Sequence, residues 1–390
     1  MTPSLPAPAA PLARRRDEFP SLARGIHLLS HSLGPMPLGA ARAMQEYLER
    51  WQEHLGEDAW AAGWWELSSQ VGDRLARIIG GAAGTVQVQP STTVALAAAA
   101  SCFDFDHDRR RKVITSALDF PSTGYVWMEQ RRLGAEIVVV PAEDGIITPP
   151  ERILDAIDAS TCLVALSHTS FLSSHRLDPR PIIETAHRHG ARVLLDVYQS
   201  AGCVELEAAA WEVDFLIGGS IKWLCGGPAC GYLYVRPDLL PALRPRLTGW
   251  TAHAEPFAFA PGAIRYAGTT RRFSQGTPAI PALYSCLPGL QLVEEIGVAA
   301  IAADSRRRTA WMVDVVRDRG WRLNSPPEAG RRGGSVMIGV DRPEEMVARL
   351  ARRGVYVDWR PGAGLRLSPH FFNTDEEVRE AMEILADLMK

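Results

Sequence analysis

The stretch FLIGGSIKWLCGGPACGYLYV, residues 215–235, places one lysine, Lys222, between an apolar run and a run of small residues. The pattern predicts a strand, a glycine-flanked turn that carries the lysine, and a second strand. A lysine is costly to bury without a partner. The side chain therefore either reaches solvent or supplies an amine that a ligand at this position needs.

Short apolar runs on the N-terminal side of this stretch alternate with segments long enough for helices. The expected strands are 112–118, 136–141, 162–168, 192–197 and 214–220. The expected helices between them are 123–134, 150–158 and 178–190. Strands that are buried on both faces and separated by helices indicate an α/β fold with a mostly parallel sheet. The run 231–237 follows a turn and is a candidate antiparallel addition to that sheet.

The pattern changes near residue 290. A long helix is expected at 288–318, and the segments after it are strands at 335–340, 355–360 and 365–369 and helices at 343–353 and 375–389. This mixture predicts a compact α+β domain. We expect a flexible N-terminal arm over 1–25, a large α/β domain over 26–290 and a small C-terminal domain over 291–390.

The region ahead of the sheet is expected to be helical. Residues 48–81 have helical character, with a break near Gly63. A second, alanine-rich helix is expected at 91–103, where the hydroxyl residues Ser91 and Thr92 are natural N-caps.

The composition excludes several classes of protein. The 390 residues are 46% hydrophobic and carry a net charge of −3, whereas a general nucleic-acid binder shows a basic excess. No apolar run reaches the length of a membrane span, and the N-terminus lacks the apolar segment of a secretion signal. The expected partner is therefore a small molecule or a second copy of the chain, with no nucleic acid and no membrane.

The six cysteines lie singly, mostly within apolar runs: Cys102, Cys162, Cys203, Cys225, Cys230 and Cys286. The spacing of Cys225 and Cys230 is not that of zinc ligands or of a redox pair. Buried, reduced thiols are typical of a cytoplasmic protein, which is the location we expect. No metal site is expected.

Polar side chains gather where open α/β sheets bind ligands, at the carboxyl ends of the strands. One expected strand ends in Asp196, and the next ends in Ser220, which Lys222 follows. The helix that begins at Ser91 and Thr92 offers free N–H groups and hydroxyls, which together suit a phosphate.

These groups match the parts of one cofactor. A buried carboxylate such as Asp196 needs a cationic partner, which a protonated pyridine nitrogen supplies. An aromatic side chain such as Phe120 stacks on a flat heterocycle, and a buried lysine forms a Schiff base with an aldehyde. Phosphate, pyridinium, ring face and aldehyde together describe pyridoxal 5′-phosphate (PLP). Each feature alone has an ordinary structural explanation, but their order along the chain favours the cofactor.

Beyond residue 25 the chain resembles the kynureninase branch of the class V aminotransferase group, within the fold-type I PLP enzymes. The resembling segments are HSLGPMP (31–37), AWAAGWWELSSQVGDRLARIIG (59–80), DFPSTGYV (119–126), RLTGWTAH (246–253), FSQGTP (273–278) and LRLSPHFFNT (365–374). The resemblance implies a sheet of the seven-stranded type in the large domain, a small C-terminal domain, and a homodimer whose active site is shared between subunits.

Position by position, the resemblance implies roles for the residues already singled out. Lys222 would hold the cofactor as a Schiff base and move the Cα proton of the substrate. Asp196 would pair with the pyridine nitrogen, and Phe120 would stack on its ring. Ser91 and Thr92 would bind the phosphate.

The resemblance also implies roles for residues farther along the chain. Ser220 would assist at the phosphate, and Gln199 would hydrogen-bond the 3′-oxygen of the cofactor. Trp250 and Thr277 would come from the neighbouring subunit, Thr277 near the phosphate and Trp250 beside cofactor and substrate. Arg366 would hold the α-carboxylate of an amino-acid substrate by a charge-assisted fork.

Five positions depart from the kynureninase pattern. Ile221 stands where the family has a tyrosine that binds phosphate and serves in acid–base chemistry on the substrate carbonyl. Gln199 replaces a histidine, Thr123 an aspartate, Ala95 an asparagine and His31 an asparagine. The scaffold is kynureninase-like, while the groups that tune catalysis differ.

Three functions are compatible with these residues. The first is kynureninase-type hydrolysis of a Cβ–Cγ bond, giving anthranilate and alanine from kynurenine. The alternative is class V transamination or β-elimination on another amino acid, which the glutamine at 199 and the absent tyrosine favour. A cysteine desulfurase is disfavoured because no cysteine follows Cys286 to act as its nucleophile. The third is a non-catalytic PLP-fold binding module, which the joint presence of Lys222, Asp196 and Arg366 argues against.

Overall fold

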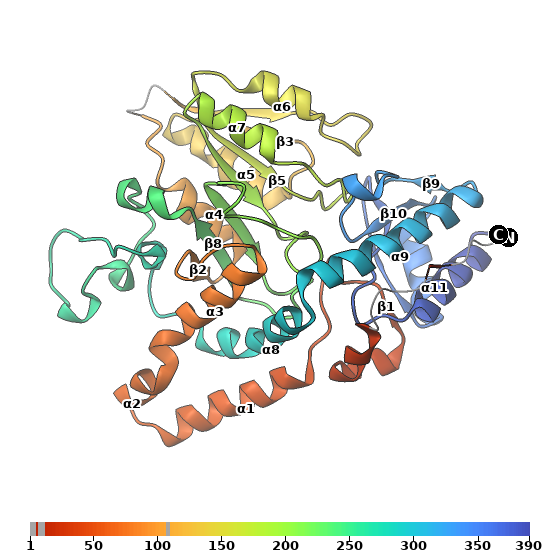
Figure 1. Ribbon diagram of the computed structural model, residues 1–390, viewed down its shortest axis with the longest axis horizontal. Helices are drawn as coiled ribbons and strands as arrows, with labels where there is room; N and C mark the ends of the chain where they lie inside the picture. The colour runs from red at the N-terminus through yellow and green to blue at the C-terminus, as the bar shows by residue number, and fades with distance from the viewer. Residues whose placement is uncertain (1–4, 7–11, 107–109) are drawn as a thin grey trace.

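The computed structural model describes residues 5–6, 12–106 and 110–390. A seven-stranded sheet with helices on both faces forms the larger part, and a four-stranded sheet with its own helices forms the C-terminal part, drawn in blue in Figure 1. The α/β fold with a mostly parallel seven-stranded sheet, which the resemblance implied, is confirmed.

Of the seven strands of the large sheet, six run in the same direction and β8 runs opposite to them. In spatial order the strands are β2 (Val86–Gln89), β8 (Gly231–Val235), β7 (Phe215–Gly219), β6 (Arg192–Asp196), β5 (Thr161–Ser167), β3 (Lys112–Ser116) and β4 (Glu136–Val140). The strands β3 to β7 are parallel, and β8 runs antiparallel to β7, both as predicted. The edge strand β2 was not predicted, because its sequence VQVQ is short and alternates polar with apolar residues.

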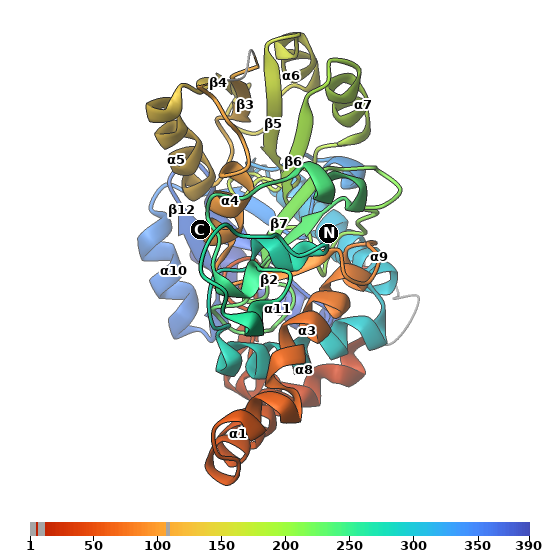
Figure 2. The same ribbon diagram turned by 90° about the vertical axis from the view of Figure 1, so that its left-hand side faces the viewer.

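Helices cover both faces of this sheet, as Figures 1 and 2 show. The helices of this larger part are α1 (Leu38–Glu53), α2 (Glu57–Ala59), α3 (Trp65–Ile78), α4 (Thr92–Ala100), α5 (Pro121–Gln130), α6 (Pro150–Ala156), α7 (Arg180–Arg188) and α8 (Ile280–Ile296). Of these, α1 and α2 lie away from the sheet, and α1 packs against α8 (Figure 1). Along β7, Phe215 and Ile217 pack in the core that contains Trp127 of α5, whereas Leu216 packs in the core that contains Leu75 of α3. Successive side chains of β7 therefore face α4 and α5 on one side and α3, α7 and α8 on the other.

The expected helix at 48–81 is interrupted as predicted. A single turn of π-helix spans Trp60–Trp64, and Gly63 within it has φ +128°, a conformation that favours glycine. The chain changes direction there between α2 and α3.

The prediction of one long helix at 288–318 was wrong. Two helices, α8 and α9 (Val298–Asp318), meet at Gly297, whose φ of +85° breaks the helical path. Among the described residues no single helix is long and apolar enough to cross a membrane; α8 and α9 pass that test only together, and they meet at an angle of 81°.

The C-terminal part has a four-stranded antiparallel sheet in the order β12 (Asp358–Arg360), β13 (Gly364–Leu367), β10 (Val336–Gly339) and β9 (Arg322–Leu323). Its helices are α10 (Pro343–Arg352) and α11 (Asp375–Leu388), close to the predicted ranges. The strand predicted at 355–360 is divided, because β11 (Val355–Tyr356) pairs instead with β1 (Ile26–His27). The N-terminal segment is thereby tied to the C-terminal part.

The predicted flexible arm over 1–25 falls partly outside the described residues. Where it is described, 3₁₀-helices span Leu12–Glu18 and Pro20–Arg24, and the flexibility of the arm stays a prediction. Phe19 is buried against two phenylalanine rings near the start of α11, with centroids 5.1 and 5.8 Å away. The boundaries at 26–290 and 291–390 stay predictions.

Candidate active site

A cavity of about 250 Å³ lies at the carboxyl ends of β6 and β7, where α4 and α5 begin. Its polar and aromatic lining is made of Ser91, Thr92, Thr93, Phe120, Ser122, Thr123, Asp196, Tyr198, Lys222 and Cys230. The sequence singled out Ser91, Thr92, Phe120, Asp196 and Lys222 as ligand-binding residues, and the structure brings these five together.

The loop between β7 and β8 holds Lys222 at this cavity. The Ser220 N–H donates to the Cys230 carbonyl at 2.9 Å, and the Ser220 hydroxyl donates to the Gly227 carbonyl at 2.9 Å. These bonds join the two ends of the loop and so fix the position of Lys222, which lies within it. Ser220 is buried and lies outside the cavity lining, so in this structure it fixes the loop rather than reaching a phosphate.

Burial changes the acid–base properties of Lys222. Loss of water around the ammonium lowers its pKa to about 8, and the neighbouring Asp196 opposes this shift. At pH 7 the neutral fraction of Lys222 is therefore about 300-fold larger than the neutral fraction of an ordinary lysine of pKa 10.5. A neutral amine is the form that attacks an aldehyde or accepts a proton.

Asp196 ends β6 and is buried beside the lysine. Its Oδ1 accepts the Tyr198 N–H at 2.9 Å, and the Thr123 side chain also hydrogen-bonds the carboxylate. Burial raises the pKa of Asp196, while these bonds and Lys222 counteract the rise. Within the described part of the chain no arginine or lysine forms an ion pair with this carboxylate. A cationic ring nitrogen would therefore find a hydrogen-bonded carboxylate here that has no ion-pair partner among the described residues.

The N-terminus of α4 forms the opposite end of the cavity. Ser91 is the N-cap and accepts the Val94 N–H at 3.2 Å, and Thr92 donates to the Gly218 carbonyl at 2.8 Å. A Cβ at Gly231 would lie 2.3 Å from the Ser91 carbonyl carbon, so only glycine lets β8 approach the helix this closely. The free N–H groups and the helix dipole at this point suit an anion such as a phosphate.

Phe120 and Tyr198 provide aromatic faces next to the amine. Lys222 Nζ lies 5.7 Å from the Phe120 ring centroid and 3.9 Å from that of Tyr198. Phe120 also packs edge-on against Phe171. The sequence reasoning missed Tyr198, although its place two residues after the strand-terminal aspartate was a usable signal.

Gln199 does not line the cavity. Its Nε2 donates to the His31 carbonyl at 3.0 Å, and its Oε1 accepts the Trp223 indole N–H at 3.1 Å. Both ends of the amide are therefore hydrogen-bonded, and the side chain holds Trp223, the residue that follows Lys222. The predicted contact with the cofactor's 3′-oxygen stays a prediction without support from this geometry.

Arg366 lies on β13 and is already paired. Its Nε and Nη2 donate to the two Asp358 carboxylate oxygens at 2.8 and 2.6 Å, and its Nη1 donates to the Phe171 carbonyl. His31, whose pKa burial lowers to about 4, contacts the same carboxylate through Nε2 at 2.7 Å. Although burial opposes it, hydrogen bonds from His31 and Arg366 hold the pKa of Asp358 below its usual range. The guanidinium is thus oriented by Asp358 rather than free.

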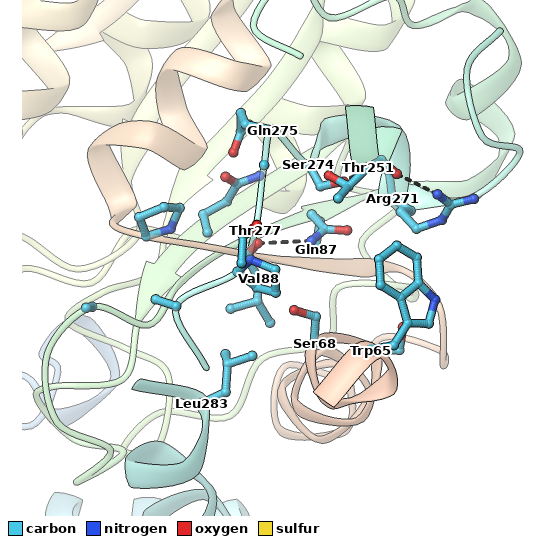
Figure 3. Close-up of a pocket in the computed structure, with 17 residues that line it drawn as sticks. Trp65, Ser68, Gln87, Val88, Thr251, Arg271, Ser274, Gln275, Thr277 and Leu283 are labelled. Carbon is cyan, nitrogen blue, oxygen red and sulfur yellow. Dashed lines mark hydrogen bonds between the residues drawn. The ribbon is translucent and has the colours of Figure 1, made fainter. Parts of the chain in front are cut away.

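Thr277 and Trp250 do not line the cavity that holds Lys222. Thr277 lines a second cavity of about 140 Å³ together with Gln87 and Arg271, as Figure 3 shows. Trp250 is 41% exposed and packs beside that cavity on Trp65, with ring centroids 5.9 Å apart. Their predicted contribution to a neighbouring subunit's site stays a prediction.

The residues of the first cavity fit PLP. Each part of that molecule has one partner in the cavity: Lys222 for the aldehyde, Asp196 for the ring nitrogen, the aromatic faces for the ring, and the helix N-terminus for the phosphate. Two glycine-dependent close approaches, at Gly219 and Gly231, shape the cavity around those partners.

Known proteins share this fold over almost the whole chain. The family model for aminotransferase class-V matches residues 26–379. An uncharacterized aminotransferase, YcbU, of Bacillus subtilis is 30% identical over 378 residues, which cover 95% of this chain and 96% of that protein. A kynureninase of Pseudomonas fluorescens is 29% identical over 395 residues, which cover 97% of this chain and 92% of that enzyme.

Solved structures show the same fold at lower identity. The apo cysteine desulfurase of Thermococcus onnurineus NA1 has a TM-score of 0.86 at 19% identity, with 98% of this chain and 99% of that one covered. A C-DES mutant with glycine covalently linked to its PLP cofactor has a TM-score of 0.85 at 22% identity, covering 95% and 99%.

Fold and cavity together define a PLP-dependent enzyme of fold type I. The chain belongs to the class V aminotransferase family, and its cofactor is pyridoxal 5′-phosphate.

Proposed function

We propose that this protein transfers the amino group of an L-amino acid, with Lys222 as the proton-transfer group. The observation that carries the proposal is the cavity's small set of charged groups. Among the described residues that line it, only Lys222 and Asp196 are charged. Transamination needs one group that moves a proton from the substrate Cα and delivers one back, and Lys222 Nζ suits both tasks.

PLP, when bound, supplies an electron sink for the substrate's Cα. The chain's own residues hold and orient it: Asp196 keeps the ring nitrogen protonated, and Ser91, Thr92 and the first N–H groups of α4 hold the phosphate. Lys222 first provides the amine that carries the cofactor and then moves the Cα proton. Its lowered pKa makes the neutral, basic form accessible near neutral pH.

Kynureninase-type hydrolysis is the second candidate, favoured by the kynureninase relatives at 27–29% identity. That reaction also adds water to a carbonyl, a step that requires a further acid–base group. Ile221 lines the cavity at the position where kynureninases have a tyrosine, and an isoleucine does not move protons. This difference is why we place transamination first.

A substrate screen separates the two candidates. The purified holoenzyme is incubated with single L-amino acids, including L-kynurenine, with and without a keto acid as amino acceptor. Formation of a new keto acid with loss of the visible band of the bound cofactor supports transamination. Release of anthranilate and alanine from kynurenine at the same enzyme concentration would replace that assignment by hydrolysis. A holoenzyme that converts no amino acid would contradict both.

Arg366 is proposed to hold the substrate carboxylate, with Asp358 setting the orientation of its guanidinium. Replacing Arg366 with alanine is expected to raise KM about 10- to 100-fold, because a hydrogen bond to a charged group contributes about 1.5–3 kcal/mol. The measurement is steady-state kinetics with the best amino acid from the screen.

Arg360 is the matched control for this variant. It pairs with the same Asp358 at 3.3 Å, but its side chain is 44% exposed. Exposed ion pairs contribute about 0–1 kcal/mol, so Arg360→Ala is expected to change KM less than about fivefold. Equal effects of the two substitutions would refute the role of Arg366.

We also propose a cytoplasmic homodimer. Large apolar side chains stay exposed on α1 and on the loop beside the second cavity: Leu38, Leu48, Trp51, Trp250, Phe257 and Phe259. Trp250, Phe257 and Phe259 gather beside Trp65, which lines the second cavity together with Thr277, and this exposed aromatic cluster supports a subunit contact that brings the loop to another copy. Burial of five of the six cysteines supports a reducing compartment.

A further inference from the structure

We propose that Tyr198 is a cofactor-positioning residue: its ring forms one aromatic wall of the PLP slot, Phe120 forms another, and its hydroxyl braces the phosphate end at Thr92. The proposal rests on PLP as the cofactor and adds a residue that the kynureninase resemblance did not supply.

A hydrogen bond of its backbone N–H fixes the position of Tyr198. Its N–H donates to Asp196 Oδ1 at 2.9 Å, so the residue is tied to the carboxylate that faces the ring nitrogen. The same bond turns the chain at the end of β6 and directs the side chain into the cavity. Any displacement of Tyr198 therefore also disturbs Asp196.

The ring of Tyr198 lies against β7. A Cβ at Gly219 would lie 2.8 Å from the ring atoms of Tyr198, so a larger residue there would displace the ring. Gly218 makes room in the same way for the ring of Tyr232. Successive strand residues face opposite sides of a sheet. The pair of glycines in FLIGGS thus accommodates one tyrosine on each face, and only Tyr198 lies on the cavity face.

The amine of Lys222 lies over the rings of both walls. Nζ lies 3.9 Å from the Tyr198 centroid and 5.7 Å from the Phe120 centroid. A flat ring attached to that nitrogen is consequently placed beside both aromatic faces. Stacking contacts of this kind contribute beyond simple burial.

The hydroxyl of Tyr198 lies close to the Thr92 side chain at the phosphate end of the cavity. Because Thr92 donates its own proton to the Gly218 carbonyl, it has a lone pair free to accept from the tyrosine. Burial raises the pKa of Tyr198 to about 12, with Asp196 adding to the effect. The hydroxyl therefore stays protonated and acts as a donor, not as a base that replaces the tyrosine absent at 221.

Tyr232 shows what a purely structural tyrosine in this sheet looks like. It is fully buried on the opposite face, and its hydroxyl has no hydrogen-bond partner in the described structure. The two residues are thus a matched pair that differs in access to the cavity.

The test compares wild type, Tyr198→Leu, Tyr198→Phe and Tyr232→Phe. The bound cofactor is removed from each full-length protein, and PLP is titrated back while the visible absorption spectrum is recorded. Tyr198→Leu is expected to weaken PLP binding at least tenfold and to shift the visible band. Tyr198→Phe is expected to keep the band position while weakening binding severalfold, and Tyr232→Phe is expected to match wild type in both.

Two results would overturn the proposal. One is a Tyr198→Leu protein with wild-type PLP affinity and spectrum. The other, which decides the matter even if the leucine variant does not fold, is a Tyr198→Phe protein no different from Tyr232→Phe in PLP affinity. Failure of wild type itself to take up PLP would overturn the cofactor assignment along with the proposal, so the two failures are distinguishable.

Discussion

The Lys222→Arg protein should lack the visible band of the lysine Schiff base and should turn over amino acids at least about 10²-fold more slowly than wild type. Arginine keeps the positive charge next to Asp196 but forms no Schiff base with an aldehyde, and its guanidinium stays protonated near neutral pH. Both tasks assigned to the lysine are lost while the local charge is preserved. The measurements are the visible absorption spectrum after reconstitution with PLP and the rate of keto-acid formation.

The chain has only three lysines that could hold the cofactor: Lys112, Lys222 and Lys390. Lys112 therefore serves as the control for Lys222. Lys112 is also buried, but it donates to the Ala156 carbonyl and pairs with Asp158, both at 2.7 Å. Lys112→Arg should keep the colour and the activity. Reduction of the wild-type holoenzyme with borohydride should attach the cofactor to the peptide that contains Lys222. Attachment to either of the other two lysines would refute the site.

Replacing Asp196 with asparagine should lower turnover by about 10²–10⁴-fold while the protein still folds and still contains PLP. Asparagine keeps an oxygen that accepts the Tyr198 N–H, so the turn after β6 survives. It carries no negative charge, so the ring nitrogen is no longer kept protonated and the cofactor withdraws electrons less strongly. The decisive comparison is turnover per bound PLP.

Asp119→Asn is the matched control for this second variant. Asp119 also lies at the carboxyl end of the sheet, where burial raises its pKa to about 6 and the Ser116 and Ser167 N–H groups donate to it. It lies outside the cavity lining. Its replacement should lower the melting temperature more than it lowers turnover per bound PLP. An Asp196→Asn enzyme with wild-type turnover would contradict the proposed pairing.

Local patterns along the chain were enough to predict most of the large sheet and part of the site. The parallel strands β3, β5, β6 and β7 are buried on both faces, and that burial is visible as apolar runs, whereas the edge strand β4 is partly exposed. The capping role of Ser91 was visible in the same way, because the residue type and the helix that follows are neighbours in sequence. Lys222 and Asp196 were found because strand ends at one edge of a parallel sheet must converge.

The failures have a common physical cause. The break at Gly297 depends on how α8 and α9 each pack, and a lone glycine in a helical pattern does not reveal its φ angle. The strand β2 has too few residues and too little apolar character to stand out. In both cases the tertiary environment outweighs the local preference.

Residue types and their order along this chain established the sheet, the cofactor class and the lysine–aspartate pair, because each depends on burial within one segment or on strand ends that share an edge. Folding in three dimensions assigned the partners of individual polar groups. Arg366 is held by Asp358 and His31, Gln199 is held by His31 and Trp223, and Tyr198 lies close to Gly219 and Thr92. Many of these pairings join positions far apart in the sequence, and hydrogen bonds are directional and short, so no periodicity of the sequence encodes them.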